Sequence, residues 1–151
     1  YLLGILGVAI ALGSVLAGVI SGDRIQPNLI PVGALGMTVC FILLGLLTPT
    51  YASVAGLIFL TGFSAGFYII PLQALMQYLS PDGERGRFLG TANALSFCFT
   101  SFGAVVFWVA SNPIGMPANR IHLICGGLAL VGTVTGLVYF RRITVARAKV
   151  A

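Results

Sequence analysis

The chain has 151 residues, of which 58% are hydrophobic and only 7% are charged, and its mean hydropathy is +1.06. Soluble domains usually contain about a quarter charged residues, so this composition excludes an ordinary soluble globular protein. The formal net charge is +5, but the charged residues occur mainly in short breaks between apolar stretches and at the C-terminus. No soluble basic face remains for nucleic acid, so we expect no nucleic-acid partner.

Five apolar stretches follow one another along the chain. Four are near the roughly 20 residues that a helix needs to cross a bilayer core about 30 Å thick, and the third is long enough to tilt or to extend past the lipid. Continuous apolar runs such as residues 105–109 differ from the alternating pattern of a membrane β-strand. The sequence therefore predicts an all-α integral membrane protein with five transmembrane helices. The predicted spans are Tyr1–Ile20, Leu29–Leu47, Ala52–Leu79, Phe88–Ala110 and Ile121–Phe140.

The distribution of charge predicts how the spans are oriented. Lys and Arg beside the ends of spans mark the cytoplasmic side. Seven of the eight Lys and Arg residues lie in the first break (21–28), the third break (80–87) and the tail after the last span. We therefore expect these segments to be cytoplasmic in a multi-pass plasma-membrane protein. Residues 1–140 are predicted to form the helical bundle and residues 141–151 a basic cytoplasmic tail.

Small residues recur four positions apart in three of the spans. Such pairs let the backbones of two helices approach closely in lipid. They are typical of simple close packing, and a dedicated dimer face is the alternative. The pairs are Gly13 and Ala17, Gly62 and Gly66, and Gly132 and Gly136.

Polar side chains form a stripe along one face of the third span and another along the fourth. Gln73 and Gln77 are four residues apart in the third span, and Asn93 begins the stripe of the fourth. Polar groups at membrane depth avoid acyl chains, so each stripe either bonds a neighbouring helix or lines a substrate pathway. For the second alternative, we predict that a substrate head group contacts Tyr68, Gln73, Gln77 and Asn93.

The charged cytoplasmic breaks suggest a gate. Short loops with opposed charges can pair with helix ends and hold a carrier closed on one side. The alternative is that these charges are solvated and only anchor the spans. The predicted gate residues are Asp23, Arg24, Glu84, Arg85 and Arg87.

No catalytic residue, metal site or cofactor is predicted from these residues. No Asp, Glu, Lys or Arg lies within the body of any span. Glycerolipid acyltransferases use a His as base with an Asp five residues later. The only His is His122, and the position five residues later is Gly127. The chain itself is therefore not expected to be an enzyme.

Several of these residues also resemble a known family. The Asp23-Arg24 turn resembles the signature loop of the major facilitator superfamily, as does the Pro-x-x-x-Arg-Gly-Arg turn from Pro81 to Arg87. Residues 12–24 with 28–33, and residues 66–77, look like the carboxy-terminal half of bacterial lysophospholipid transporters. By this likeness, the five spans would be the last five of a twelve-helix bundle, and the N-terminal half would precede Tyr1.

The resemblance implies a carrier that moves lysophospholipid, chiefly lysophosphatidylethanolamine, inward across the bacterial inner membrane by alternating access. Its implied partners are membrane lipid, the missing N-terminal half and a cytoplasmic acyltransferase, which some relatives carry as a fusion after the last span. Carriers with unrelated cargo share this fold. The alternatives are therefore a facilitator that exports drugs or sugars, or the membrane portion of a transporter–acyltransferase fusion.

Overall fold

The structure is a computed structural model that describes residues 1–22, 26–47 and 50–148. The described residues form five α-helices, and each contains a segment long and apolar enough to cross a membrane. The prediction of an all-α protein with five membrane-spanning helices is therefore confirmed. In chain order the helices are α1 (Leu2–Ser21), α2 (Leu29–Leu46), α3 (Tyr51–Leu79), α4 (Arg85–Ser111) and α5 (Ala118–Ala148).

The last two helices are longer than hydropathy predicted. α4 begins at Arg85 rather than Phe88, so Arg85 and Arg87 lie in its first turn. α5 continues to Ala148, eight residues beyond the predicted end of the span. Arg occurs in both extensions and is a good helix former, so a helix can extend past the point where the apolar stretch stops. The division into a bundle and a basic tail stays a prediction.

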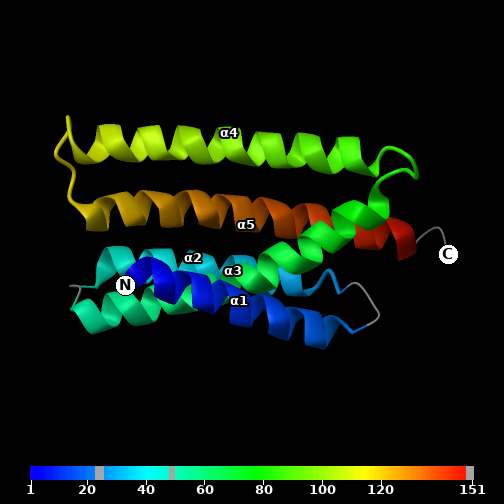
Figure 1. The fold of residues 1–151 in the computed structure, drawn as a ribbon, viewed down its shortest axis with the longest axis horizontal. Coiled ribbons are helices and arrows are strands. Elements are labelled where there is room, and N and C mark those ends of the chain that lie inside the picture. The colour runs from blue at the N-terminus through cyan, green and yellow to red at the C-terminus, as the bar shows by residue number, and fades with distance from the viewer. Residues whose placement is uncertain (23–25, 48–49, 149–151) are drawn as a thin grey trace.

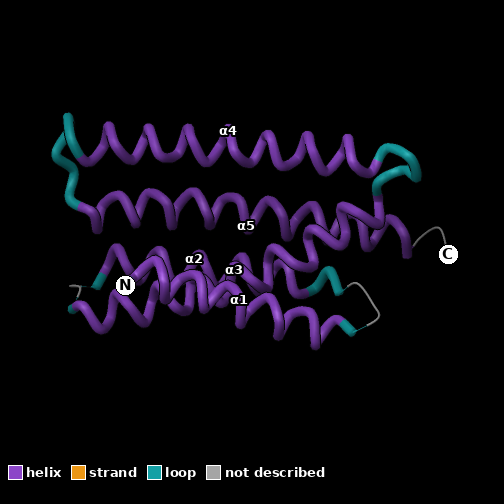
Figure 2. The backbone as a smooth tube through the Cα atoms, in the orientation of Figure 1, coloured by secondary structure: helices purple, strands orange, loops and turns teal. Residues whose placement is uncertain are grey.

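Successive helices run in opposite directions between two ends of the molecule. The end of α2, the start of α3 and the α4–α5 connection lie at one end, and the α3–α4 connection and the C-terminal part of α5 lie at the other (Figure 1). The backbone trace in Figure 2 shows the same alternation, with loops only between the helices. This arrangement is the one that a chain crossing a bilayer five times requires. Which end faces the cytoplasm stays a prediction from charge.

Four helices pack against one another in a connected row. α1 packs on α3, α3 packs on α2, and α2 packs on α5. The α1–α3 contact is made by small residues, because Gly13 and Ala17 of α1 and Gly62 and Gly66 of α3 are all buried. A Cβ atom on Gly62 would lie only 2.9 Å from the main-chain oxygen of Leu6. These two small-residue pairs therefore serve close helix packing.

Glycines also bring α2 close to both of its neighbours. A Cβ atom on Gly33 would lie 2.6 Å from the main-chain oxygen of Ser64 in α3. On α5, a Cβ atom on Gly126 would lie 2.9 Å from Cγ1 of Ile42 in α2. The side-chain oxygens of Thr38 and Thr133 are 3.1 Å apart across the same pair of helices. α2 is thus fixed between α3 and α5.

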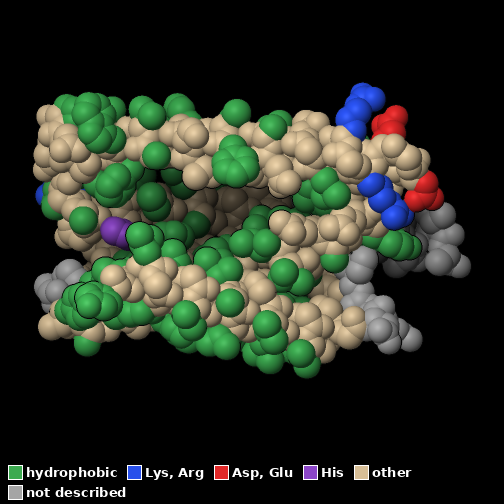
Figure 3. Space-filling view, in the orientation of Figure 1, with side chains coloured by type: hydrophobic (Ala, Val, Ile, Leu, Met, Phe, Trp, Pro, Cys, Tyr) green, Lys and Arg blue, Asp and Glu red, His purple; other side chains and the backbone are tan. Residues whose placement is uncertain are grey.

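α4 differs from the other helices in how little of it is covered. None of its residues is buried, although the structure describes the whole helix. It makes only a few contacts, with α3 at one of its ends and with α5. Figure 3 shows the molecule hollowed between α4 on one side and α1 and α3 on the other.

Candidate functional site

A cavity of about 480 Å³ lies between α2, α3 and α5. This volume falls within the range of small-molecule binding pockets. Most of the lining side chains are apolar, and the polar side chains among them are hydroxyl groups. The lining residues are Ile30, Pro31, Ala34, Met37, Thr38 and Phe41 of α2, Tyr68 and Leu72 of α3, and Ala129, Gly132, Thr133, Gly136 and Leu137 of α5.

Two of the three hydroxyl groups are bonded to each other. The Thr38 hydroxyl donates to the main-chain oxygen of Ala34 at 2.8 Å, which uses its single proton. In the 3.1 Å contact between the two threonines, Thr133 is therefore the donor and Thr38 the acceptor. Both residues are buried, whereas Tyr68 is half-buried. The cavity thus presents a mainly apolar surface with a few hydroxyl oxygens.

The wall formed by α5 is lined by glycine. A Cβ atom added to Gly132 or Gly136 meets no other atom within 4 Å. Sequence analysis grouped this pair with the helix-packing pairs. In the described part of the chain, the pair instead borders the cavity and leaves space there.

The four residues predicted to contact a substrate head group lie in two different environments. Tyr68 lines the cavity between α2, α3 and α5. Gln73 and Gln77 on α3 and Asn93 on α4 are exposed and lie outside the lining of that cavity. The structure thus brings only Tyr68 to the cavity, and a substrate-binding role for all four stays a prediction.

Sequence analysis did not single out Thr38 or Thr133. Each is a threonine in a largely apolar span, and such a residue usually bonds only to its own helix. Thr38 does make that bond, and it also contacts Thr133 from a helix 95 residues away in sequence. The spacing of Pro31, Ala34 and Thr38 on one helical face was the signal that could have pointed to the α2 wall.

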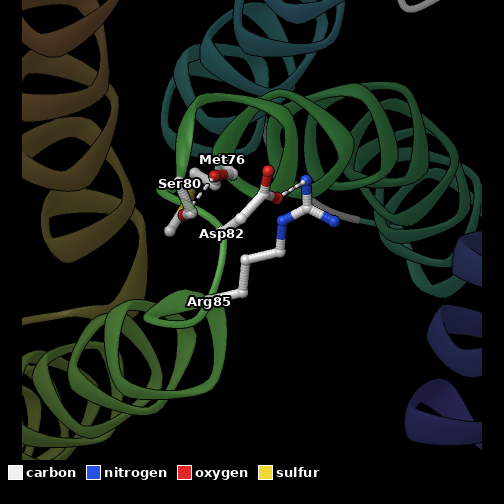
Figure 4. A network of polar contacts seen from close by, with 4 residues as sticks. All are labelled: Met76, Ser80, Asp82 and Arg85. Carbon is white, nitrogen blue, oxygen red and sulfur yellow. Dashed lines mark hydrogen bonds and ion pairs between the residues drawn. The ribbon is translucent and has the colours of Figure 1, made fainter.

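Two of the five predicted gate residues, Asp23 and Arg24, lie outside the described residues, so nothing is said of their structure. Charged side chains gather where α3 meets α4 (Figure 3). Arg85 contacts Asp82 there, with 2.8 Å between Nη2 and Oδ1, and both side chains are largely exposed (Figure 4). This ion pair stays within one connection and does not join two distant helices.

Glu84 and Arg87 lie at the same corner of the molecule. They line a second cavity of about 320 Å³, together with Met76 of α3 and residues of the first turns of α4. Close by, the Ser80 hydroxyl donates to the main-chain oxygen of Met76 at 2.6 Å and holds the end of α3 (Figure 4). The α3–α4 connection is therefore locally ordered, while its function as a gate stays a prediction.

One of three comparisons with known proteins identifies a family for this chain. A sequence model of the Major Facilitator Superfamily matches residues 1–105, from α1 into α4, which is more than half of the chain. The chain belongs to the Major Facilitator Superfamily. Members of this superfamily are typically membrane transporters rather than enzymes, so this chain is a multi-pass transporter protein. The search of curated proteins and the search of solved structures found no match.

Proposed function

We propose that this superfamily member moves lysophospholipid, chiefly lysophosphatidylethanolamine, inward across the bacterial inner membrane. The observation that supports the proposal is the mainly apolar cavity between α2, α3 and α5. A lysophospholipid combines one acyl chain with a polar head. Its chain needs an apolar surface during transport, because exposing hydrocarbon to water costs about 0.8 kcal/mol per methylene group.

The chemistry of the cavity favours such a lipid over a sugar. Each hydroxyl of a sugar needs a hydrogen-bond partner once it leaves water. The cavity offers the hydroxyls of Thr38, Tyr68 and Thr133, and the two threonines already bond each other. An apolar or amphiphilic drug fits a cavity with the same lining, so drug transport is the remaining alternative. The uptake experiment below distinguishes it from lysophospholipid transport.

One end of the cavity lies near the end of the helices that is predicted to be cytoplasmic. Ile30 and Pro31 are in the first turn of α2, whereas Leu72 and Gly136 lie past the middle of α3 and α5. If the positively charged end is cytoplasmic, these residues lie in the cytoplasmic half of the bilayer. In this proposal a cytoplasmic acyltransferase receives the lipid after its release.

Transport by alternating access takes place between two helical halves. We propose that an N-terminal half completes the carrier and that the polar stripes of α3 and α4 face it. Gln73, Gln77 and Asn93 are exposed in the described structure, so their side chains are available to a head group there. Asp23, Arg24, Glu84, Arg85 and Arg87 remain the proposed gate at the cytoplasmic end.

The test is uptake of labelled lysophosphatidylethanolamine by cells that lack their own carrier. The transporter is expressed with all sequence encoded upstream and downstream of this chain. Gln73→Leu and Asn93→Leu are each compared with wild type at equal amounts in the membrane, and Ser101→Leu is the control, because Ser101 is also exposed on α4. We expect uptake that requires the transporter and that falls at least about tenfold in both variants but not in the control.

Each result has a distinct meaning. Uptake by wild type that neither variant reduces would retain the function and discard the head-group residues. No uptake by a well-folded wild type would contradict the lysophospholipid proposal. In that case, efflux of amphiphilic drugs is the next activity to measure.

A further inference from the structure

The glycines of α5 serve two different purposes along one helix. Gly126 lies against α2, where a Cβ atom would come within 2.9 Å of Ile42 Cγ1. Gly132 and Gly136, farther along, border the cavity and have no atom within 4 Å of an added Cβ. They are four residues apart and therefore lie on the same face of α5. This part of the wall is kept open by the absence of side chains.

The cavity is elongated along the helices. Its lining extends from Ile30 to Phe41 on α2, which is about 17 Å of helix axis at 1.5 Å per residue. Ala129 to Leu137 form the facing wall on α5, and Leu72 contributes from α3. An elongated, mainly apolar space of this kind suits a hydrocarbon chain.

The chemistry of the cavity favours a lipid chain as its occupant. Its lining is uncharged and lies on helices that cross the membrane, where acyl chains are the surrounding solvent.

We infer that this cavity holds the acyl chain of the transported lipid and that Gly132 and Gly136 set the length of chain it accepts. The inference rests on the proposed lysophospholipid transport and adds chain-length selectivity to it. A larger side chain at either position occupies the space of the terminal methylene groups. The longest chains are then excluded first, while short chains still fit.

The experiment measures uptake of lysophosphatidylethanolamines with short, medium and long saturated chains. Gly132→Leu and Gly136→Leu are compared with Gly127→Leu, in the complete transporter. Gly127 is a matched control because it is exposed on the same helix, has no atom within 4 Å of an added Cβ, and does not line the cavity. We expect the ratio of long-chain to short-chain uptake to fall about tenfold in the two test variants, and to stay at the wild-type value in the control.

Two results would overturn the inference while leaving the proposed function standing. One is an unchanged chain-length profile in both test variants. The other is an equal loss for every chain length together with a lower melting temperature than that of Gly127→Leu, which would mean that protein packs against these glycines.

A second measurement does not depend on transport. Purified transporter is photolabelled with a lysophosphatidylethanolamine that bears a diazirine near the end of its acyl chain. We expect the label in the peptide that contains residues 129–137, and a loss of most of it in Gly136→Leu. Labelling elsewhere in the protein, with none in this peptide, would contradict the inference even if wild-type uptake proves absent.

Discussion

The row formed by α1, α3, α2 and α5 and the separate helix α4 differ in packing, although all are apolar enough to cross a membrane. In the row, each helix has at least one glycine that lies against the backbone or side chains of a neighbouring helix. In α4, a Cβ atom on Gly90 or Gly103 would meet nothing within 4 Å. Hydrophobicity therefore places a segment in the bilayer, whereas closely approaching small residues place it against a neighbour.

The hydroxyl groups of the two regions show the same difference. Thr38 and Thr133 bond across two helices and are buried. On α4, Ser96 donates to Ala92 at 2.9 Å and Thr100 donates to Ser96 at 2.8 Å, so both satisfy only their own helix. A hydroxyl at membrane depth thus joins helices only where small residues have already brought the backbones together.

The largest expected effect comes from a bulky side chain in the glycine-packed row. In Gly66→Leu the new side chain meets the main chain of Ser14 and Gly13, with Gly13 Cα only 2.8 Å from the Cβ position. Backbone atoms cannot move aside as a flexible side chain can, so we expect destabilisation of at least about 3 kcal/mol and little folded protein. The measurement is the fraction that stays monodisperse in detergent during heating.

Gly103→Leu on α4 is the control for this substitution. It adds the same side chain in a membrane-spanning helix, where nothing lies within 4 Å of the added Cβ. We expect its folded yield to match wild type. Equal losses of folded protein in the two variants would show that leucine disturbs any helix of this protein. The conclusion that glycine packing distinguishes the row from α4 would then be wrong.

An intermediate effect is expected from Thr38→Val. The substitution removes the acceptor of the Thr133 hydroxyl at nearly constant volume. Hydrogen bonds between membrane helices average about 0.6 kcal/mol and reach about 1.7, so we expect a loss within that range. Thr100→Val on α4 removes only a bond within one helix and should have a smaller effect.

A double-mutant cycle with Thr133→Val measures the bond between the two threonines directly. Thermal unfolding of the two single variants and the double variant in the same detergent supplies the data. A coupling energy near zero would contradict the direct bond, because independent sites add.

The smallest effect is expected from Asp82→Asn at the α3–α4 connection. The Asp82–Arg85 pair is 2.8 Å long, but its two side chains are 92% and 56% exposed, respectively. Exposed ion pairs contribute about 0–1 kcal/mol and are screened by salt. We expect a change in melting temperature at the limit of detection at low salt and none at high salt. A large change would indicate that Asp82 has a further partner.

The spans could be predicted from the sequence because a bilayer requires long apolar helices whatever their neighbours. The contacts between the spans could not. Gly66 and Gly136 each belong to a glycine pair with four-residue spacing, yet one packs on α1 and the other borders a cavity. The positions at which the helices cross decide this difference. These positions cannot be inferred from residue spacing within a single helix.

The candidate site was predictable to a smaller extent. Tyr68 was predicted to contact a substrate head group; it lines the larger cavity, and its binding role stays a prediction. Gln73 was predicted beside it, but five residues turn a helix by about 500°, and Gln73 is exposed on another face. Thr133 became visible only through its contact with α2, since nothing in the sequence of α5 relates it to Thr38.

Pro71 lies fully buried inside α3, between the part of the helix that packs on α1 and the part that reaches both cavities. Its nitrogen has no hydrogen to donate to the main-chain oxygen of Phe67, so α3 lacks one main-chain hydrogen bond there. We therefore expect α3 to bend more easily here than elsewhere. Before Pro71, Gly66 lies against Gly13 of α1; after it, Leu72 lines the larger cavity and Met76 the smaller one. A bend at Pro71 would change the size of both cavities together.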